Sequence, residues 1–223
     1  MGAAMKPGIG SAVNGTSSDV IPVLQRLYRH PLYVYLFTVL RIRLAAYAAI
    51  EPYVPASGRI LDVGCGYGIF SNYLAIRSAA RTVQGIDRNR RKLQYADKRV
   101  PNASFSVADL FHDRGEAPYD CLLFLHVLHH LSSFAEQAAV VRRCRELLGD
   151  HGHLLVLEVD RRPRLKFALA WLADHFLYLG DSIYYRDQRS FARLFGDGGF
   201  DTEVIPMHRG LLYPQILYVC RKR

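Results

Sequence analysis

The stretch "ILDVGCGYGIF", residues 60–70, decides the fold of this chain. Apolar residues lead to Asp62, three glycines follow at alternate positions, and apolar residues resume at Ile69. This order predicts a strand, a tight turn and a helix whose first N–H groups point at the turn. Because glycine lets the backbone approach a ligand closely, the stretch predicts a ligand site at the end of the strand.

The spacing of the glycines separates two kinds of nucleotide-binding turn. A nicotinamide-dinucleotide site needs the pattern G-x-G-x-x-G, but the third residue after Gly66 is Ile69. The chain instead has Asp62, Gly64, Gly66 and Gly68 at alternate positions. An oxidoreductase that uses this dinucleotide is therefore disfavoured.

Around this turn, apolar strand-like runs alternate with amphipathic stretches of helical period, which predicts an α/β fold with a mostly parallel sheet covered on both faces. Only eight residues, 207–214, separate the last two strands, too few for a helical crossover, so these strands should form an antiparallel hairpin. The expected strands are 59–63, 82–87, 103–107, 119–125, 153–159, 200–206 and 215–222, and the expected helices lie near 68–79, 89–99, 134–148 and 188–197.

Two further acids stand at strand ends. Asp87 ends the second expected strand, and Asp109 follows the third. Asp87 has the place of the acid that accepts the ribose hydroxyls in Rossmann folds. A turn or capping role together with Asn89 is the alternative for Asp87.

The glycine turn and the three acids, in this order at strand ends, resemble the class I S-adenosylmethionine-dependent methyltransferases over about residues 58–160. The resemblance implies a Rossmann-like sheet of seven strands, S-adenosylmethionine as cofactor and methyl transfer. It places Asp109 at the adenine amino group with Leu110 beside the ring, and Asp62 at the methionine end. The residues expected to bind the cofactor are Asp62, Gly64, Gly66, Gly68, Asp87, Asp109 and Leu110.

Three histidines follow the fourth strand in "LHVLHHL", residues 125–131. Their positions resemble the E-V-L-E-H motif of the ubiquinone-biosynthesis O-methyltransferases, with His126 and His129 in place of the glutamates and His130 in place of the histidine. Imidazole removes the oxygen ligands that Mg²⁺ prefers, and the spacing does not guarantee a zinc geometry, so we predict no metal. His126 is either a catalytic base or substrate contact or a structural residue, and His129 and His130 are mainly structural.

The segment 160–187 is a long helical insertion after the fifth strand, with Trp171 on its apolar stripe. The stripe serves either packing or a cap over the substrate, because the insertion lies above the carboxyl ends of the strands. The candidate substrate contacts are His129, His130, Trp171 and Tyr178.

The N-terminal part divides into a Gly/Ser-rich flexible tail, 1–20, and a helical extension, 21–57; the methyltransferase domain would occupy 58–223. On a helical wheel the four arginines of the extension fall within about half of the circumference and leave an apolar face. This pattern fits a helix at a membrane surface or a cap on the core. Two of these arginines, Arg41 and Arg43, disfavour a membrane span.

The chain has 29 Lys and Arg against 20 Asp and Glu, a net charge of +9 that favours an anionic partner. Nucleic acid is disfavoured, because the chain lacks the [DN]-P-P-[YFW] and Pro-Cys motifs of the family's DNA enzymes. Basic residues beside aromatic ones favour an anionic membrane. Four scattered cysteines and no signal peptide indicate a cytoplasmic protein, peripheral at the inner membrane face.

We therefore predict a methyltransferase that transfers a methyl group to an oxygen of a hydrophobic, aromatic or lipid-like small molecule. Methylation of RNA or protein is one alternative, and a domain that binds S-adenosylmethionine without catalysis is another. The acceptor molecule, the atom methylated and the oligomeric state stay open.

Overall fold

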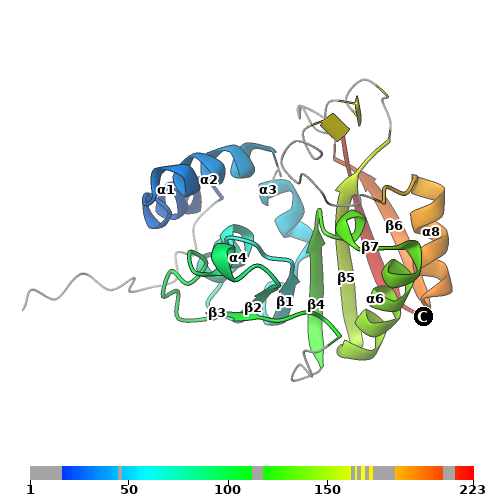
Figure 1. Cartoon of the computed structure of the whole chain (residues 1–223). Helices are drawn as coiled ribbons and strands as arrows, with labels where there is room; N and C mark the ends of the chain where they lie inside the picture. The colour runs from blue at the N-terminus through cyan, green and yellow to red at the C-terminus, as the bar shows by residue number, and fades with distance from the viewer. Residues whose placement is uncertain are drawn as a thin grey trace, which may run out of the picture.

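Seven strands form one sheet in the part of the chain that the computed structural model describes, residues 17–44, 47–111, 118–161, 164, 167–168, 171–172, 184–207 and 214–223. The strands are β1 (Gly58–Val63), β2 (Arg81–Asp87), β3 (Ala103–Val107), β4 (Tyr119–Leu125), β5 (Leu148–Val159), β6 (Phe200–Pro206) and β7 (Gln215–Lys222). Their order is β3-β2-β1-β4-β5-β7-β6 (Figure 1). The first five run parallel, and β7 lies antiparallel between β5 and β6, which confirms the predicted mixed sheet and its C-terminal hairpin.

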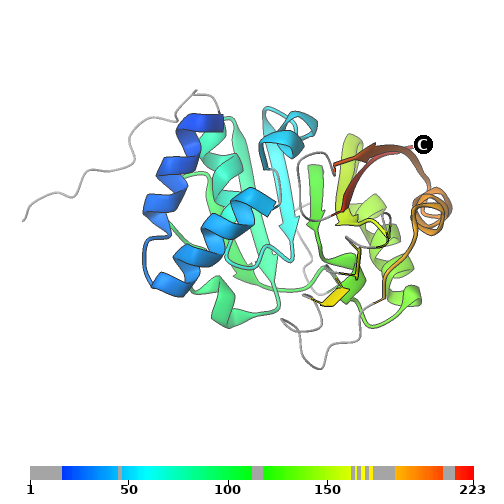
Figure 2. The same cartoon turned by 90° about the horizontal axis from the view of Figure 1, so that it is seen from above.

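Helices cover both faces of the sheet, as the near-continuous apolar strands require (Figure 2). One face buries Tyr73 together with residues of the N-terminal helices, and the other buries Val140 and Phe195. The helices are α1 (Ser17–Leu27), α2 (Leu32–Leu44), α3 (Tyr47–Ile50), η1 (Glu51–Tyr53), α4 (Ile69–Arg77), α5 (Arg90–Leu93), η2 (Leu128–His130), α6 (Phe134–Leu147) and α8 (Gln188–Asp197).

The predicted helical extension is present, but α1 already begins at Ser17, inside the stretch predicted to be a flexible tail. Val20 and Leu24 of this helix are fully buried in the core that α4 shares, and this burial orders the segment. The tail prediction therefore fails for residues 17–20, and residues 1–16 lie outside the described part of the chain.

The helix expected over 89–99 is much shorter than predicted, because α5 ends at Leu93. Two local features keep a helix from reaching residue 99. The side chain of Asp97 accepts a hydrogen bond from the N–H of Arg99, and Arg99 has a left-handed φ of 57°. Pro101 further disfavours a helical conformation at the residue before it.

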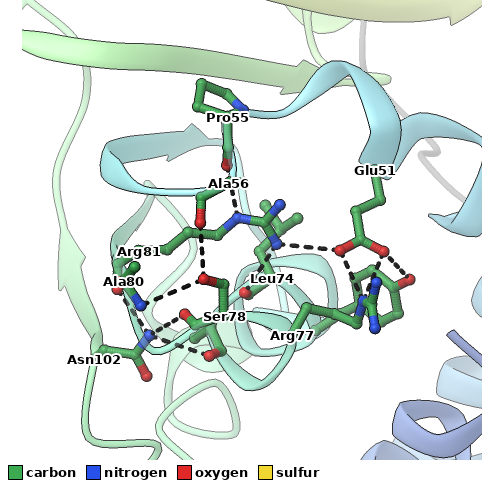
Figure 3. Close-up of polar contacts among 11 residues, drawn as sticks. Glu51, Pro55, Ala56, Leu74, Arg77, Ser78, Ala80, Arg81 and Asn102 are labelled. Atoms are coloured by element: carbon green, nitrogen blue, oxygen red, sulfur yellow. Dashed lines mark hydrogen bonds and ion pairs between the residues drawn. The ribbon is translucent and has the colours of Figure 1, made fainter. Parts of the chain in front are cut away.

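A buried ion-pair network fixes the connection from η1 to α4 and β2 (Figure 3). The Glu51 carboxylate lies 2.7 Å from Arg77 Nε and 3.2 Å from Arg81 Nη1, and it accepts a hydrogen bond of 2.7 Å from the Tyr73 hydroxyl. Burial raises the pKa of Glu51, but these donors outweigh burial and hold that pKa below its usual value. The network thus ties the N-terminal helices to the sheet.

The insertion after β5 is helical at residues 164, 167–168 and 171–172, and the rest of 162–183 lies outside the described residues. Its described part lies beyond the tip of β5, and α2 lies towards the same end of the sheet, above α4 (Figure 1). Among the described helices, none alone has the length and hydropathy of a membrane span; α2 with Tyr47–Tyr53 reaches them only as a bent pair.

Candidate active site

A cavity of about 430 Å³ lies at the carboxyl ends of β1, β2 and β4. This is the edge at which open α/β sheets bind ligands, and the volume suits a small molecule. The glycine turn, the residues after β2 and β3, the histidine segment and α2 all contribute to its wall. Of the predicted site residues, those in the wall are Asp62, Gly64, Gly66, Asp87, Asp109, Leu110, His126, His129 and His130.

The glycines of the turn have different tasks, although all three have positive φ. A Cβ built on Gly66 would meet no atom closer than 3.9 Å, so this backbone is open to a ligand in the cavity. A Cβ on Gly68 would lie 2.6 Å from the Phe105 ring and 2.8 Å from Ala96. Gly68 lies outside the cavity wall, and its lack of a side chain lets α4 pack against β3; this differs from the cofactor contact that the sequence predicted.

Asp87 has the turn role that the sequence offered as one of two alternatives, and its geometry leaves the ribose role open to it. One carboxylate oxygen accepts the Gly66 N–H at 2.8 Å, and the other accepts the Asn89 N–H at 2.7 Å. Each carboxylate oxygen has a second lone pair, so Asp87 can close the turn and still accept two hydroxyl hydrogens from a ligand.

Asp62 is a buried acid at the end of β1, with 3% of its surface exposed. Burial raises the pKa of Asp62 to about 7. A hydrogen bond of 2.5 Å from the Ser71 hydroxyl opposes this increase but is the smaller effect. The Asp87 carboxylate raises the Asp62 pKa further. A cation that binds beside Asp62 would stabilise its ionised form, as the ammonium group at the methionine end of the expected cofactor would.

Asp109 and Leu110 form the wall after β3. Asp109 accepts the Phe111 N–H at 2.9 Å, and Arg88 Nε lies 3.7 Å from its other oxygen. Leu110 is buried with 3% exposure and offers an apolar surface inside the cavity.

His126 lies where β4 ends and has a φ of 60°, a left-handed conformation that costs a histidine about 1–3 kcal/mol. Its N–H donates to the Leu157 carbonyl oxygen at 2.8 Å, which fixes the backbone. Its Nε2 is buried and has no hydrogen-bond partner among the described residues. Burial, and after it the positive charge of Arg41, holds the pKa of His126 well below its usual value, so the imidazole is neutral at pH 7.

His129 is held by groups that the sequence did not reveal. Its Nδ1 makes a short hydrogen bond to the Glu158 carboxylate, whose other oxygen accepts the Leu128 N–H at 2.9 Å. The His129 ring stacks on Tyr185 with 5.2 Å between centroids, and the residue is 1% exposed. This geometry supports the mainly structural role predicted for His129.

His130 also lies in the cavity wall. Burial, and after it the neighbouring His129 and Lys92, lowers the pKa of His130 to about 3. In the described residues, no three His, Cys, Asp or Glu side chains are arranged to hold a metal ion.

Sequence reasoning missed several residues of the cavity wall, among them Arg41 and Gln215. Arg41 of α2 donates from Nη2 to the Leu125 carbonyl oxygen at 3.3 Å, whereas the sequence grouped it with the arginines of a membrane or solvent face. Side chains two positions apart on a helix point about 160° away from each other. Because Arg43 is exposed, Arg41 lies on the opposite side of α2, which faces the cavity. Gln215 of β7 donates to the Leu44 carbonyl oxygen at 2.8 Å, while its buried Oε1 has no partner among the described residues.

Trp171, a predicted substrate contact in the insertion, is not brought to the cavity. Trp171 is 44% exposed and is not among the residues of the cavity wall. Tyr178 lies outside the described residues.

The strand order, the glycine turn and the acids at the strand ends define a class I S-adenosylmethionine-dependent methyltransferase. A family model described as a methyltransferase domain matches residues 35–204, and the chain belongs to that family.

Two curated relatives are ubiquinone biosynthesis O-methyltransferases. That of Marinobacter nauticus is 32% identical over 117 residues, which cover 49% of this chain and 47% of the relative. That of Ralstonia nicotianae is 31% identical over 122 residues, which cover 52% and 49%. The chain thus spans about half the length of these relatives.

Two solved structures share the fold over nearly the whole of both chains. The complex of DhpI with S-adenosylhomocysteine has a TM-score of 0.65 and 16% identity, and covers 93% of this chain and 97% of its own. The magnesium protoporphyrin IX methyltransferase of Synechocystis PCC 6803, with bound S-adenosylhomocysteine, has a TM-score of 0.63 and 20% identity, and covers 92% and 96%. The likeness at this identity supports the Rossmann-like fold.

Proposed function

We propose that this protein transfers a methyl group from S-adenosylmethionine to an oxygen of a hydrophobic, aromatic or lipid-like small molecule. The observation that carries the proposal is the neutral His126, whose buried Nε2 lacks a partner among the described residues at the wall of the cavity. A hydroxyl group is a chemically suitable partner for such a nitrogen.

The cofactor side of the cavity fits S-adenosylmethionine. Asp87 has lone pairs left for the ribose hydroxyls, and Gly66 leaves its backbone open. Asp109 and Leu110 offer an acceptor and an apolar surface for the adenine, and the buried Asp62 suits the ammonium group of the methionine part. When bound, the cofactor supplies a methyl group on a positively charged sulfur. The leaving group is the neutral thioether, which makes this methyl group easy to transfer.

The residues of this chain then have two tasks, to orient the acceptor and to remove its proton. We assign His126 as the base, whose Nε2 would take the proton of the acceptor hydroxyl. The proton leaves to solvent after the methylated product departs. The Arg41 guanidinium near His126 disfavours its protonation at rest.

Much of the remaining wall is apolar and aromatic, which favours a hydrophobic acceptor. The relatives are named for methylation of oxygen in ubiquinone biosynthesis, and this supports oxygen as the acceptor atom. Tyr178 stays a proposed contact of such an acceptor. The apolar and aromatic wall residues include Phe37, Leu40, Leu44, Tyr47, Phe70, Phe111, Phe124, Leu125, Leu131 and Val140.

We further propose that the protein is cytoplasmic and works at an anionic membrane surface, where such an acceptor would dissolve. The net charge of +9 supports this, as do the arginines beside apolar residues in α1 and α2.

The test is incubation with S-adenosylmethionine that carries a labelled methyl group and with separated lipid, pigment, RNA and protein fractions. We expect label in a lipid or pigment fraction. Label in RNA or protein would support the alternative acceptors. Binding of S-adenosylmethionine without label in any fraction would support a non-catalytic domain.

A further inference from the structure

The outer face of α2 is apolar but exposed. We define the α2 outer face as Leu32, Tyr33, Leu36, Phe37 and Leu40, whose exposed fractions range from 37% to 66%. The opposite face of the helix buries Val34, Thr38 and Ile42.

This exposure is unusual for a helix of a soluble domain. Such helices normally place charged or polar residues opposite their buried face. The α2 outer face instead gathers five large apolar side chains within less than half of the helix circumference, and exposed apolar clusters of this kind mark interaction surfaces. The face therefore requires a partner.

The charges around the face select an anionic partner. Residues 20–50 contain four arginines and no Asp or Glu. Arg26, Arg29 and Arg43 are exposed. Arg29 precedes α2 in the sequence, and Arg43 lies in the last turn of α2. A second copy that docked symmetrically would bring two such basic segments together, which like charges disfavour. An anionic lipid surface would neutralise them while accepting the apolar side chains.

The α2 outer face also continues into the cavity. Phe37 and Leu40 belong both to this face and to the cavity wall, and the 43% exposed Phe111 stands in the same wall. An acceptor dissolved in a bilayer could therefore reach the cavity along apolar side chains without crossing water.

We infer that the α2 outer face docks on an anionic lipid bilayer and that the cavity receives its acceptor from that side. This inference rests on the proposed function, because it supplies the route for a hydrophobic acceptor. Leu32, Leu36 and Leu40 would lie among the acyl chains, and Arg29 and Arg43 would lie at the headgroups.

The experiment is flotation with vesicles of phosphatidylcholine alone or mixed with phosphatidylglycerol. We expect the wild-type protein to float with the mixed vesicles, less so at high salt. The double variant L32S/L36S should lose binding by about tenfold or more, since two leucines leave the lipid. These leucines are exposed and lie outside the cavity wall, so the variant should fold and should bind S-adenosylmethionine as the wild type does.

The matched control is V107S/F134S, which also removes two half-exposed apolar side chains but from β3 and α6. We expect this control to float like the wild type. Equal loss in both double variants would overturn the inference, because it would show a general effect of surface hydrophobicity. A second variant, R29A/R43A, should weaken binding to mixed vesicles and remove most of the salt dependence.

Two further results would contradict docking of the α2 outer face on a lipid bilayer. Absence of wild-type flotation with either vesicle would overturn the inference. So would a wild-type dimer that L32S/L36S converts to a monomer without any vesicle binding. Methyl transfer to a hydrophobic acceptor in solution without flotation would overturn this inference and the proposed membrane surface, but not the proposed methyl transfer. Flotation without methyl transfer would overturn the proposed acceptor alone.

Discussion

Arg41 donates a hydrogen bond to the carbonyl oxygen of Leu125, 3.3 Å away, so that the N-terminal helix α2 reaches the cavity at the tip of β4. The same guanidinium lowers the pKa of the buried Asp62, against the larger effect of burial. The Arg41 guanidinium and the Asp62 carboxyl group therefore lie at the place proposed for the methionine end of the cofactor. That end carries both a carboxylate and an ammonium group.

Arg41→Ala should weaken the binding of S-adenosylhomocysteine by about tenfold, because a charge-assisted hydrogen bond contributes about 1.5–3 kcal/mol. Calorimetric titration checks this value. The control ligand is 5′-methylthioadenosine, which lacks the amino-acid part and should bind the variant and the wild type alike. An equal loss for both ligands would show that Arg41 acts on the fold and not on the amino-acid part.

Asp87→Ala should lower the affinity for S-adenosylmethionine by about tenfold to a hundredfold, because it removes the proposed ribose acceptor and the partner of the Gly66 N–H. Asp87→Asn keeps one acceptor oxygen and should lose less. Unchanged affinity in both variants would leave Asp87 as a turn residue only. Asp120, an exposed acid that accepts the Arg59 N–H, provides the matched control through Asp120→Asn.

His126→Asn should lower kcat about a hundredfold or more and leave cofactor affinity unchanged, because the base is lost while the cofactor side is intact. The lowered pKa keeps His126 neutral, so kcat of the wild type at saturating S-adenosylmethionine should not fall as the pH decreases from 8 towards 6. Steady-state rates across this range check both statements. Wild-type turnover in His126→Asn would remove its catalytic role.

Glu51→Gln should destabilise the fold by about 3 kcal/mol, because Arg77 and Arg81 would lose their buried partner. The folded pKa of Glu51 lies below its unfolded value, so its contribution is complete above about pH 4.3 and is lost as the pH falls through the folded pKa. Urea unfolding at pH 7 and below pH 4 measures this difference. Glu146→Gln, which removes the exposed partner of Arg143, should change stability by less than about 1 kcal/mol; an equal loss in both variants would contradict the account.

The sheet could be predicted from the sequence because its signals are local. Apolar runs that end at Asp62, Asp87 and Leu125 have the period and length of buried strands, and the short 207–214 connection permits only a hairpin. The error at 89–99 arose from the side-chain turn at Asp97, which competes with a helix that the pattern alone permits.

The cavity could be predicted only in part because some of its residues depend on distant packing. Asp62, Asp87 and Asp109 follow strands that lie together, so their convergence follows from the topology. Glu158 could not be recognised as the partner of His129, because the two residues are 29 positions apart and α6 lies between their elements, η2 and β5. In the same way, the roles of Arg41 and Gly68 follow from how α2 and β3 pack, which no local pattern specifies.

The most direct test of methyl transfer from this cavity to an oxygen is NMR of the product formed from S-adenosylmethionine with a ¹³C-labelled methyl group. A lipid-soluble extract serves as acceptor, and Asp87→Ala serves as the enzyme control. We predict a ¹³C methyl resonance of an oxygen-bound methyl group in the lipid-soluble product, strongly reduced with the variant. A methyl group bound to nitrogen or carbon, or a product confined to RNA or protein, would contradict the account.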